Sequence, residues 1–438
     1  MRRNKVDIIT LGCSKNLVDS EHLLRQFLAE GFTVEHNPSR VNGEIVVVNT
    51  CGFIADAQEE SIDTILSLCQ AKKAGKLRKL IVMGCLSERF AADLIESIPE
   101  VDHYYGKFNW TEMLHDLGHK YRPELASERF LTTPPHYAYL KVSEGCNRFC
   151  AFCAIPLITG RHKSVPPTVL LDEVRRMAAG GVKEFNVIAQ DLSSYGLDLE
   201  GRMMLPELID RMADIDGVEW IRLHYAYPTQ FPLELLDVMA RRSNVCKYLD
   251  IALQHCNDKV LANMRRHIDR EATVRLINTM RDRVPGLHLR TTLMVGFPGE
   301  GEREFDELME FVDTVRFERM GAFAYSEEKG TYAAEHYDDD VPAEEKQRRL
   351  DALMERQAAI SQEIQNKKVG TTMRVIIDSE EDDYYVGRTE FDSPEVDPEV
   401  LIKKNCKLTI GNFYPVTITE ALPFELMGVS QQIIDYRL

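Results

Sequence analysis

The stretch EGCNRFCAFC, residues 144–153, decides how this chain is read, because it places Cys146, Cys150 and Cys153 within eight residues. A structural zinc site closes with four ligands, and no His or Cys stands at the usual short spacing to complete one. Iron–sulfur clusters take one thiolate per iron, so three thiolates leave one iron open. The spacing therefore predicts an open iron–sulfur cluster, and a zinc ligand set or three buried apolar cysteines are the alternatives.

The composition is that of an ordinary globular protein, with 438 residues, 44% hydrophobic and 28% charged. Its length allows two or three domains. The start, MRRNKVDIITLG, lacks the apolar stretch of a signal peptide, and no apolar run approaches the roughly 18 residues of a membrane span. We therefore expect a cytoplasmic protein with reduced or metal-bound cysteines. The net charge of −17 favours a basic partner over a phosphate backbone.

Strand-like and helix-like segments alternate along the first 130 residues. Buried-type strands are predicted over residues 5–13, 43–51 and 79–85, and helices at period 3.6 over residues 18–32 and 57–76. Such alternation predicts an α/β domain with a parallel sheet and covering helices.

A second alternating series begins near residue 136. Six βα units would form an open relative of the eight-unit barrel, whose chemistry lies at the carboxyl ends of its strands. The triplet of cysteines follows the first of these strands directly. The six predicted strands are YAYLKVS (137–143), EFNVIAQ (184–190), WIRLHYA (220–226), YLDIALQH (248–255), LHLRTTLMVGF (287–297) and MGAFAYS (320–326).

The last hundred residues change character. An amphipathic connecting helix is predicted after Pro342, and short strands with polar turns follow Gly370, which is typical of a small all-β barrel. The predicted strands are residues 373–379, 383–390, 399–404, 406–411 and 414–421. The predicted domains are residues 1–130, 131–340, a linker helix at 341–368, and 369–438.

The other cysteines divide into two groups. Cys13, Cys51 and Cys85 each end a predicted parallel strand, and parallel strands bring their carboxyl ends to one edge. A second metal site and three separate core cysteines are equally compatible with this pattern. The remaining four are expected to be buried and inert: Cys69, Cys246, Cys256 and Cys406.

The segment CNRFCAFC, with Phe152 just before its last cysteine, matches the signature of the radical S-adenosylmethionine (SAM) enzymes. In that superfamily the open iron binds the amino and carboxylate groups of SAM. An electron from the reduced cluster then releases a 5′-deoxyadenosyl radical. The resemblance implies that SAM supplies the missing fourth ligand.

Three N-terminal motifs, LGCSKNLVDSE, VVNTCGFIADAQEESID and VMGCLSERF, resemble the methylthiotransferase family of radical-SAM enzymes. The resemblance covers nearly the whole chain, and the C-terminal barrel looks like a TRAM domain. It implies that Cys13, Cys51 and Cys85 hold an auxiliary 4Fe–4S cluster, and that the 146–153 triplet holds the 4Fe–4S cluster that binds SAM. In this family one SAM donates a methyl group to a sulfur on the auxiliary cluster, and a second SAM yields the radical.

Within the family, CSKNLVDSE and NTCGFI are most similar to the type that modifies the β-carbon of an aspartate in the twelfth protein of the small ribosomal subunit. Relatives that modify adenosine in tRNA typically show CQMN-like and NTCSIRE-like text. Residues 369–438 hold six Lys/Arg and 13 Asp/Glu, a net charge of −7. This acidity suits a basic protein better than RNA. Methylthiolation of tRNA, or a non-catalytic iron–sulfur protein that binds RNA or ribosomes, are the alternatives.

Four polar residues are placed around SAM by their positions on the predicted strands. Gln190 and Asp191 end the second strand of the partial barrel, and Arg290 and Thr292 lie in the fifth. No catalytic residue is assigned beyond the cluster ligands, because hydrogen-atom abstraction needs no acid–base pair. The expected partners are the basic ribosomal protein and, by analogy, an electron donor of the flavodoxin or ferredoxin type, with no membrane.

Overall fold

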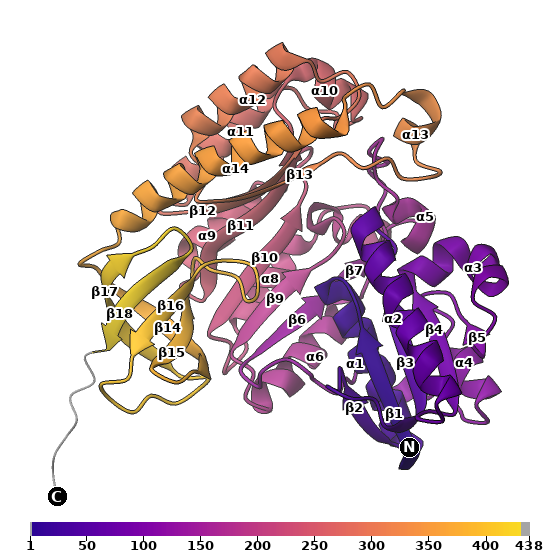
Figure 1. The fold of residues 1–438 in the computed structure, drawn as a ribbon. Helices are drawn as coiled ribbons and strands as arrows, with labels where there is room; N and C mark the ends of the chain where they lie inside the picture. Colours follow the sequence, from indigo (N-terminus) through magenta and orange to yellow (C-terminus); the bar gives the residue numbers. More distant parts are fainter. Residues whose placement is uncertain (1, 431–438) are drawn as a thin grey trace, which may run out of the picture.

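The structure, a computed structural model, describes residues 2–430, which form three successive units (Figure 1). An N-terminal α/β unit and a larger α/β unit lie side by side, and a small β-barrel follows at the far side of the larger unit. Within the described range no helix is both long and apolar enough to cross a membrane. The domain boundaries inferred from the sequence remain a prediction.

The N-terminal unit is a parallel five-stranded sheet in the order β2-β1-β3-β4-β5. Its central strand β3 (Gly43–Thr50) is buried on both faces, because Val47 packs into one apolar cluster and Val46 and Val48 into another. The three predicted strands are confirmed, and the short β2 and β5 were missed. The other elements are β1 (Arg2–Thr10), β2 (Thr33–His36), β4 (Lys79–Gly84), β5 (His103–Tyr104), α1 (Ser14–Ala29), α2 (Ala55–Lys73), α3 (Cys85–Ser97) and α4 (Trp110–Asp116).

The larger unit is an open parallel sheet of six strands in the order β13-β12-β11-β10-β9-β6, which confirms the predicted partial barrel. The strands are β6 (Tyr137–Lys141), β9 (Glu184–Ile188), β10 (Trp220–Ala226), β11 (Val245–Gln254), β12 (His288–Val295) and β13 (Arg319–Ala324). The main covering helices are α6 (Pro167–Ala179), α8 (Leu205–Ala213), α9 (Glu234–Arg241), α11 (Arg270–Arg283) and α12 (Glu302–Val315). The shorter elements are β7 (Ser143–Glu144), β8 (Lys163–Ser164), α5 (Ile155–Thr159), α7 (Leu197–Glu200), α10 (Asp258–Asn263) and α13 (Tyr332–His336).

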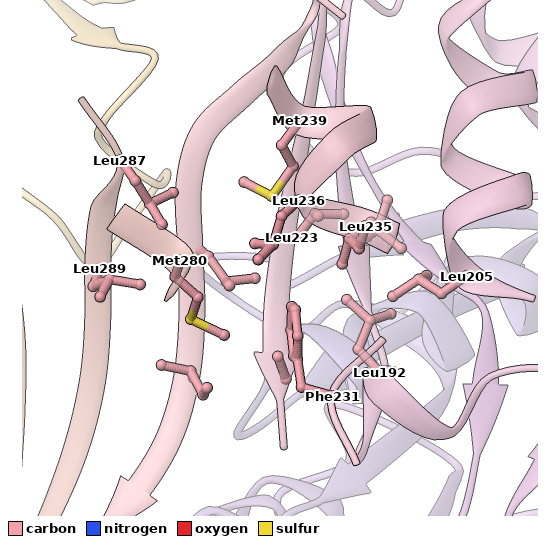
Figure 2. Close-up of a cluster of buried hydrophobic side chains, with 14 of the residues drawn as sticks. Leu192, Leu205, Leu223, Phe231, Leu235, Leu236, Met239, Met280, Leu287 and Leu289 are labelled. Atoms are coloured by element: carbon pink, nitrogen blue, oxygen red, sulfur yellow. The ribbon is translucent and has the colours of Figure 1, made fainter. Parts of the chain in front are cut away.

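The outer face of this sheet is apolar and its inner face is polar. Figure 2 shows Leu223 of β10 and Leu289 of β12 in the layer where α9 and α11 pack on the sheet, with Met280 of α11 between them. Each fully buried leucine stabilises the fold by about 1.5–3 kcal/mol. Because strand residues alternate between faces, Arg222 and His224 on β10 point to the opposite side. The face of the sheet opposite these helices therefore carries buried polar groups, such as Arg222, which pairs with Glu184.

The C-terminal barrel closes in the order β14-β15-β16-β18-β17. The predicted strand at residues 406–411 is wrong: this segment is a loop, and residues 425–430 supply the fifth strand instead. Gly411 turns at a φ of +77°, and its carbonyl accepts a hydrogen bond from the Nζ of Lys183 of the larger unit at 2.7 Å. Residues 431–438 of the predicted domain lie outside the described range. The elements are α14 (Ala343–Asn366), β14 (Thr372–Glu380), β15 (Tyr384–Thr389), β16 (Glu399–Lys403), β17 (Phe413–Ala421) and β18 (Glu425–Ser430).

Candidate active site

The three cysteines of the N-terminal unit lie at one edge of its sheet. Cys13 follows β1, Cys51 follows β3 and Cys85 follows β4, and these strands are neighbours in the sheet. The thiols are near enough to affect one another electrostatically. Burial raises the pKa of the Cys51 thiol and raises that of Cys85 to about 12. The structure therefore brings together three cysteines that are far apart in sequence, one of the two arrangements that the strand ends left open.

Glycines let the loops around these cysteines approach closely. Gly12 has a φ of +87°, and a Cβ there would lie 2.6 Å from the Cβ of Cys51. A Cβ on Gly52 would lie 2.6 Å from the backbone of Leu86. Asn16 ties the loops together, since its Nδ2 donates to the carbonyls of residues 11 and 50, both at 3.1 Å. The cysteine edge is thus a tight backbone cradle that only glycine permits.

The second triplet lies in the loop after β7. The backbone N–H of Cys146 donates to the Gly160 carbonyl at 3.2 Å, and that of Cys153 to the Cys150 carbonyl at 3.0 Å. Phe149 stands at a φ of +49°, an uncommon conformation for an aromatic residue, which turns the chain between the first two cysteines. Burial raises the pKa of the Cys146 thiol to about 12. The loop is held at both ends, so the three thiols are pre-arranged.

Positive charge surrounds this second triplet. Arg266 donates from Nη1 to the Sγ of Cys150 at 3.1 Å, and the Tyr227 hydroxyl lies 3.6 Å from the same sulfur. The guanidinium groups of Arg148 and Arg266 lie 4.3 and 4.1 Å from the centre of the Tyr227 ring. Such groups stabilise the negative charge of a thiolate-bound cluster. Sequence reasoning missed all three residues, and only Arg148, inside the cysteine motif, offered a signal.

Each triad offers three cysteine thiols. Among residues 2–430 no group of three His, Cys, Asp or Glu side chains is placed to hold a single metal ion. Thiolates are the usual ligands of iron–sulfur clusters, and a cubane cluster takes one thiolate per iron. The type and number of donors in each triad therefore match a 4Fe–4S cluster with one open iron.

The two triads face each other across the junction of the units. Cys85 packs with Ala154 and Ile158, which follow the second triplet on α5. Arg89 of α3 donates to the Gly52 carbonyl at 2.7 Å and pairs with Glu328 of the larger unit at 3.0 Å. The auxiliary-type site is therefore fixed against the loop that carries the other three cysteines.

A buried ion cluster lies beside this junction. The Nζ of Lys107 is 3.4 Å from Asp19 and 3.5 Å from Glu144, and Lys141 pairs with the same two carboxylates. Burial lowers the pKa of Lys107, but the two carboxylates outweigh that effect and raise it. Two cations and two anions thus balance in charge, and the ion pairs connect the N-terminal unit to the larger unit.

The four predicted SAM residues separate into two pairs. Asp191, after β9, accepts from Arg148 Nε at 2.7 Å, and Gln190 donates to Glu144, so both lie beside the cysteine loop. Arg290 of β12 instead lies 3.5 Å from Asp250 and from Asp397 of the C-terminal barrel. Thr292 lies two residues further along the same strand. The pairs are therefore not in contact with each other.

The four cysteines expected to be inert are mostly buried. Cys69, Cys246 and Cys256 are buried, whereas Cys406 is half-buried against the core of the C-terminal barrel.

Comparison with protein-family models gives three matches. Residues 140–312 match the radical SAM superfamily, residues 5–106 match the Uncharacterized protein family UPF0004, and residues 369–430 match the TRAM domain. These matches agree with the three units of the fold.

Curated relatives extend over the whole chain. The ribosomal protein uS12 methylthiotransferase RimO of Parabacteroides distasonis is 62% identical over 98% of this chain and 99% of its own length. The protein of the same name from Cytophaga hutchinsonii is 49% identical over 98% of both chains. This chain belongs to the RimO family. It is a radical-SAM methylthiotransferase, and the cofactors of RimO enzymes are two 4Fe–4S clusters and SAM, as the resemblance implied.

Solved structures with a similar fold include the radical SAM methyltransferase TsrM from Kitasatospora setae with cobalamin and a [4Fe-4S] cluster bound. It has a TM-score of 0.55 at 15% identity and covers 76% of this chain and 77% of its own. At this identity the likeness shows the fold alone.

Proposed function

We propose that this chain transfers a methylthio group to the β-carbon of an aspartate in ribosomal protein uS12. The observation that carries the proposal is the packing of one three-cysteine site against the loop of the other, at the mouth of a polar partial barrel. The RimO relatives support it, since they carry the name of uS12 methylthiotransferases. When bound, the two clusters and SAM supply a methylated sulfur and a carbon-centred radical.

The chain's own residues hold and shield these groups. We propose Cys13, Cys51 and Cys85 as ligands of the auxiliary cluster, and the 146–153 triplet as ligands of the cluster that binds SAM. Gln190 and Asp191 are proposed to line the SAM site because they lie beside that loop. Arg290 and Thr292 are proposed to line it from β12, deeper in the barrel.

The C-terminal barrel is proposed to dock the basic substrate protein. Much of its acidity turns inward: Asp378, Asp392, Glu395 and Asp397 all bind residues of the partial barrel. Four exposed acids gather at the turn between β14 and β15, residues 380–383, while Glu399 and Glu420 are exposed elsewhere on the barrel. Such a turn attracts a basic protein and repels a phosphate backbone. The proposed site of action is the cytoplasm, where uS12 is made, with a flavodoxin- or ferredoxin-type electron donor.

A one-pot competition tests the proposed substrate. Reconstituted enzyme, SAM, sulfide and reductant meet a peptide from the uS12 loop together with unmodified tRNA under anaerobic conditions. Mass spectrometry is expected to find the methylthio group on the peptide aspartate alone, and Cys146→Ala enzyme gives no product. Modification of the tRNA alone would leave the family right and the substrate wrong. Absence of 5′-deoxyadenosine would favour a non-catalytic protein.

A further inference from the structure

The cations around the junction of the two triads are almost all neutralised. Among residues 2–430, Lys15 forms no ion pair with any carboxylate and, unlike Arg266, which also forms none, donates no hydrogen bond to a cysteine sulfur. The paired cations are Lys107 and Lys141 with Asp19 and Glu144, Arg148 with Asp191, and Arg290 with Asp250 and Asp397, and Arg266 donates to the Cys150 sulfur.

Lys15 reaches from the auxiliary triad toward the barrel. It lies in the first turn of α1, two residues after Cys13, and its Nζ stands 3.4 Å from the centre of the Tyr225 ring. Tyr225 lies near the end of β10 at a φ of +63°. On the same helix, Leu17 and Val18 pack against the inner face of the sheet at β6 and β9, where Figure 1 shows α1 beside β6. The ammonium group is therefore held at the mouth of the partial barrel.

The groups near Lys15 leave its charge available. Burial, followed by the charge of Arg222, lowers the pKa of His224 well below its usual value, so this imidazole is neutral. Asp250 is bound by Arg290 at 3.5 Å. Glu395 of the C-terminal barrel, which is exposed, accepts from the hydroxyls of Tyr137 and Tyr139 at 3.2 and 3.3 Å. These carboxylates therefore have other partners and form no ion pair with Lys15.

We propose that the Lys15 ammonium binds the side-chain carboxylate of the substrate residue and thereby selects an acidic residue over a neutral one. This inference rests on the proposed function. A carboxylate that enters a partly desolvated site needs a charged partner, and an ammonium group supplies a strong one. In aspartate the carboxylate is bonded directly to the β-carbon. Holding it fixes the reacting carbon two bonds from the oxygen that contacts Lys15.

The test compares two peptides and three variants of the reconstituted enzyme. One peptide carries the target aspartate, and the other carries asparagine in its place. The variants are Lys15→Met, Lys15→Arg and, as a matched control, Lys76→Met, an exposed lysine before β4 at the opposite edge of the sheet. Fluorescence anisotropy gives the Kd of each peptide, and mass spectrometry gives methylthio product. Iron content checks that both clusters remain.

Wild type and K76M are expected to bind the aspartate peptide about 10- to 100-fold more tightly than the asparagine peptide. K15M should bind the two peptides equally while keeping its iron, and K15R should retain most of the preference. Two results would overturn the role of Lys15. One is the same preference for the aspartate peptide in wild type and K15M, and the other is an equal loss of affinity for both peptides in iron-replete K15M. Failure of the wild type to modify the aspartate peptide at all would instead overturn the proposed function.

Discussion

Cys85 is part of one cysteine triad and packs against the segment that follows the other. It is the first residue of α3, it belongs to the auxiliary triad, and it packs against Ala154 and Ile158 beside the other triplet. Its thiol also lies 3.6 Å from the side-chain oxygen of Asn16, which fixes the neighbouring loops. A change at this residue therefore affects the ligand set and the contact between the sites at once.

Removing one ligand from either triad should remove one cluster. Wild type should bind about eight irons per chain after anaerobic reconstitution, and Cys85→Ala and Cys146→Ala about four each, because each triad is proposed to hold one four-iron cluster. Cys69→Ala is the matched control, since Cys69 is buried in α2 outside both triads. Iron assay and visible absorbance measure the outcome. Full iron in either triad variant would contradict the assignment of ligands.

At the scale of elements, the turn from β1 into α1 depends on Gly12. Gly12→Ala should lose the auxiliary iron and lower the free energy of unfolding, because the new Cβ would lie 2.6 Å from Cys51 Cβ at a φ of +87°. Gly75→Ala is the control: its φ is +72°, but nothing lies within 4 Å of its Cβ. That variant should lose only about 1–2 kcal/mol of stability. Iron content and urea unfolding are measured for both variants. Equal iron content in both would contradict the claim that the cysteine edge needs glycine at position 12.

The segment between β15 and β16 packs against the partial barrel. Asp392 pairs with Arg319 of β13 and accepts from Thr389 Oγ1 at 2.5 Å. Burial raises the pKa of Asp392, but Arg319 and Lys368 outweigh it and hold the pKa well below its usual value of 3.8. The segment is therefore anchored by an ionised carboxylate.

Asp392→Asn should destabilise the protein by about 3–5 kcal/mol near neutral pH, because Arg319 is left buried and unpaired. A carboxylate with a lowered folded-state pKa contributes stability above its unfolded-state pKa, and this contribution is lost as the pH falls toward the folded value. The difference in free energy of unfolding between wild type and D392N should therefore become smaller below about pH 4. Urea unfolding at several pH values measures it, with exposed Asp382→Asn as control. A gap that widens in acid would contradict this account.

At the scale of the whole molecule, we expect methylthio transfer to require a fixed position of one α/β unit relative to the other. Arg89→Met removes the buried pair with Glu328 and the bond to the Gly52 carbonyl. The R89M enzyme should keep its iron and form 5′-deoxyadenosine within about twofold of wild type. Its yield of methylthio product should fall at least about tenfold, because the two cysteine triads would no longer be held in the correct relative position. Arg78→Met, an exposed arginine of the same unit, is the control. Loss of both products in parallel would show that Arg89 supports folding instead.

Local patterns in the sequence determined the ligand chemistry and the layers. The spacing of the 146–153 triplet predicted one open cluster, and the alternation of strands and helices predicted the six-stranded sheet, because both patterns lie in neighbouring residues. The second cluster was implied only by the resemblance to the family. The contacts between units could be determined only from the tertiary structure. The contacts of Arg266 with Cys150, of Lys15 with Tyr225, and of the 390–397 segment with the barrel join residues with no shared local pattern. The true fifth strand of the C-terminal barrel was missed for the same reason: closure selects strands by long-range pairing, which propensity does not encode.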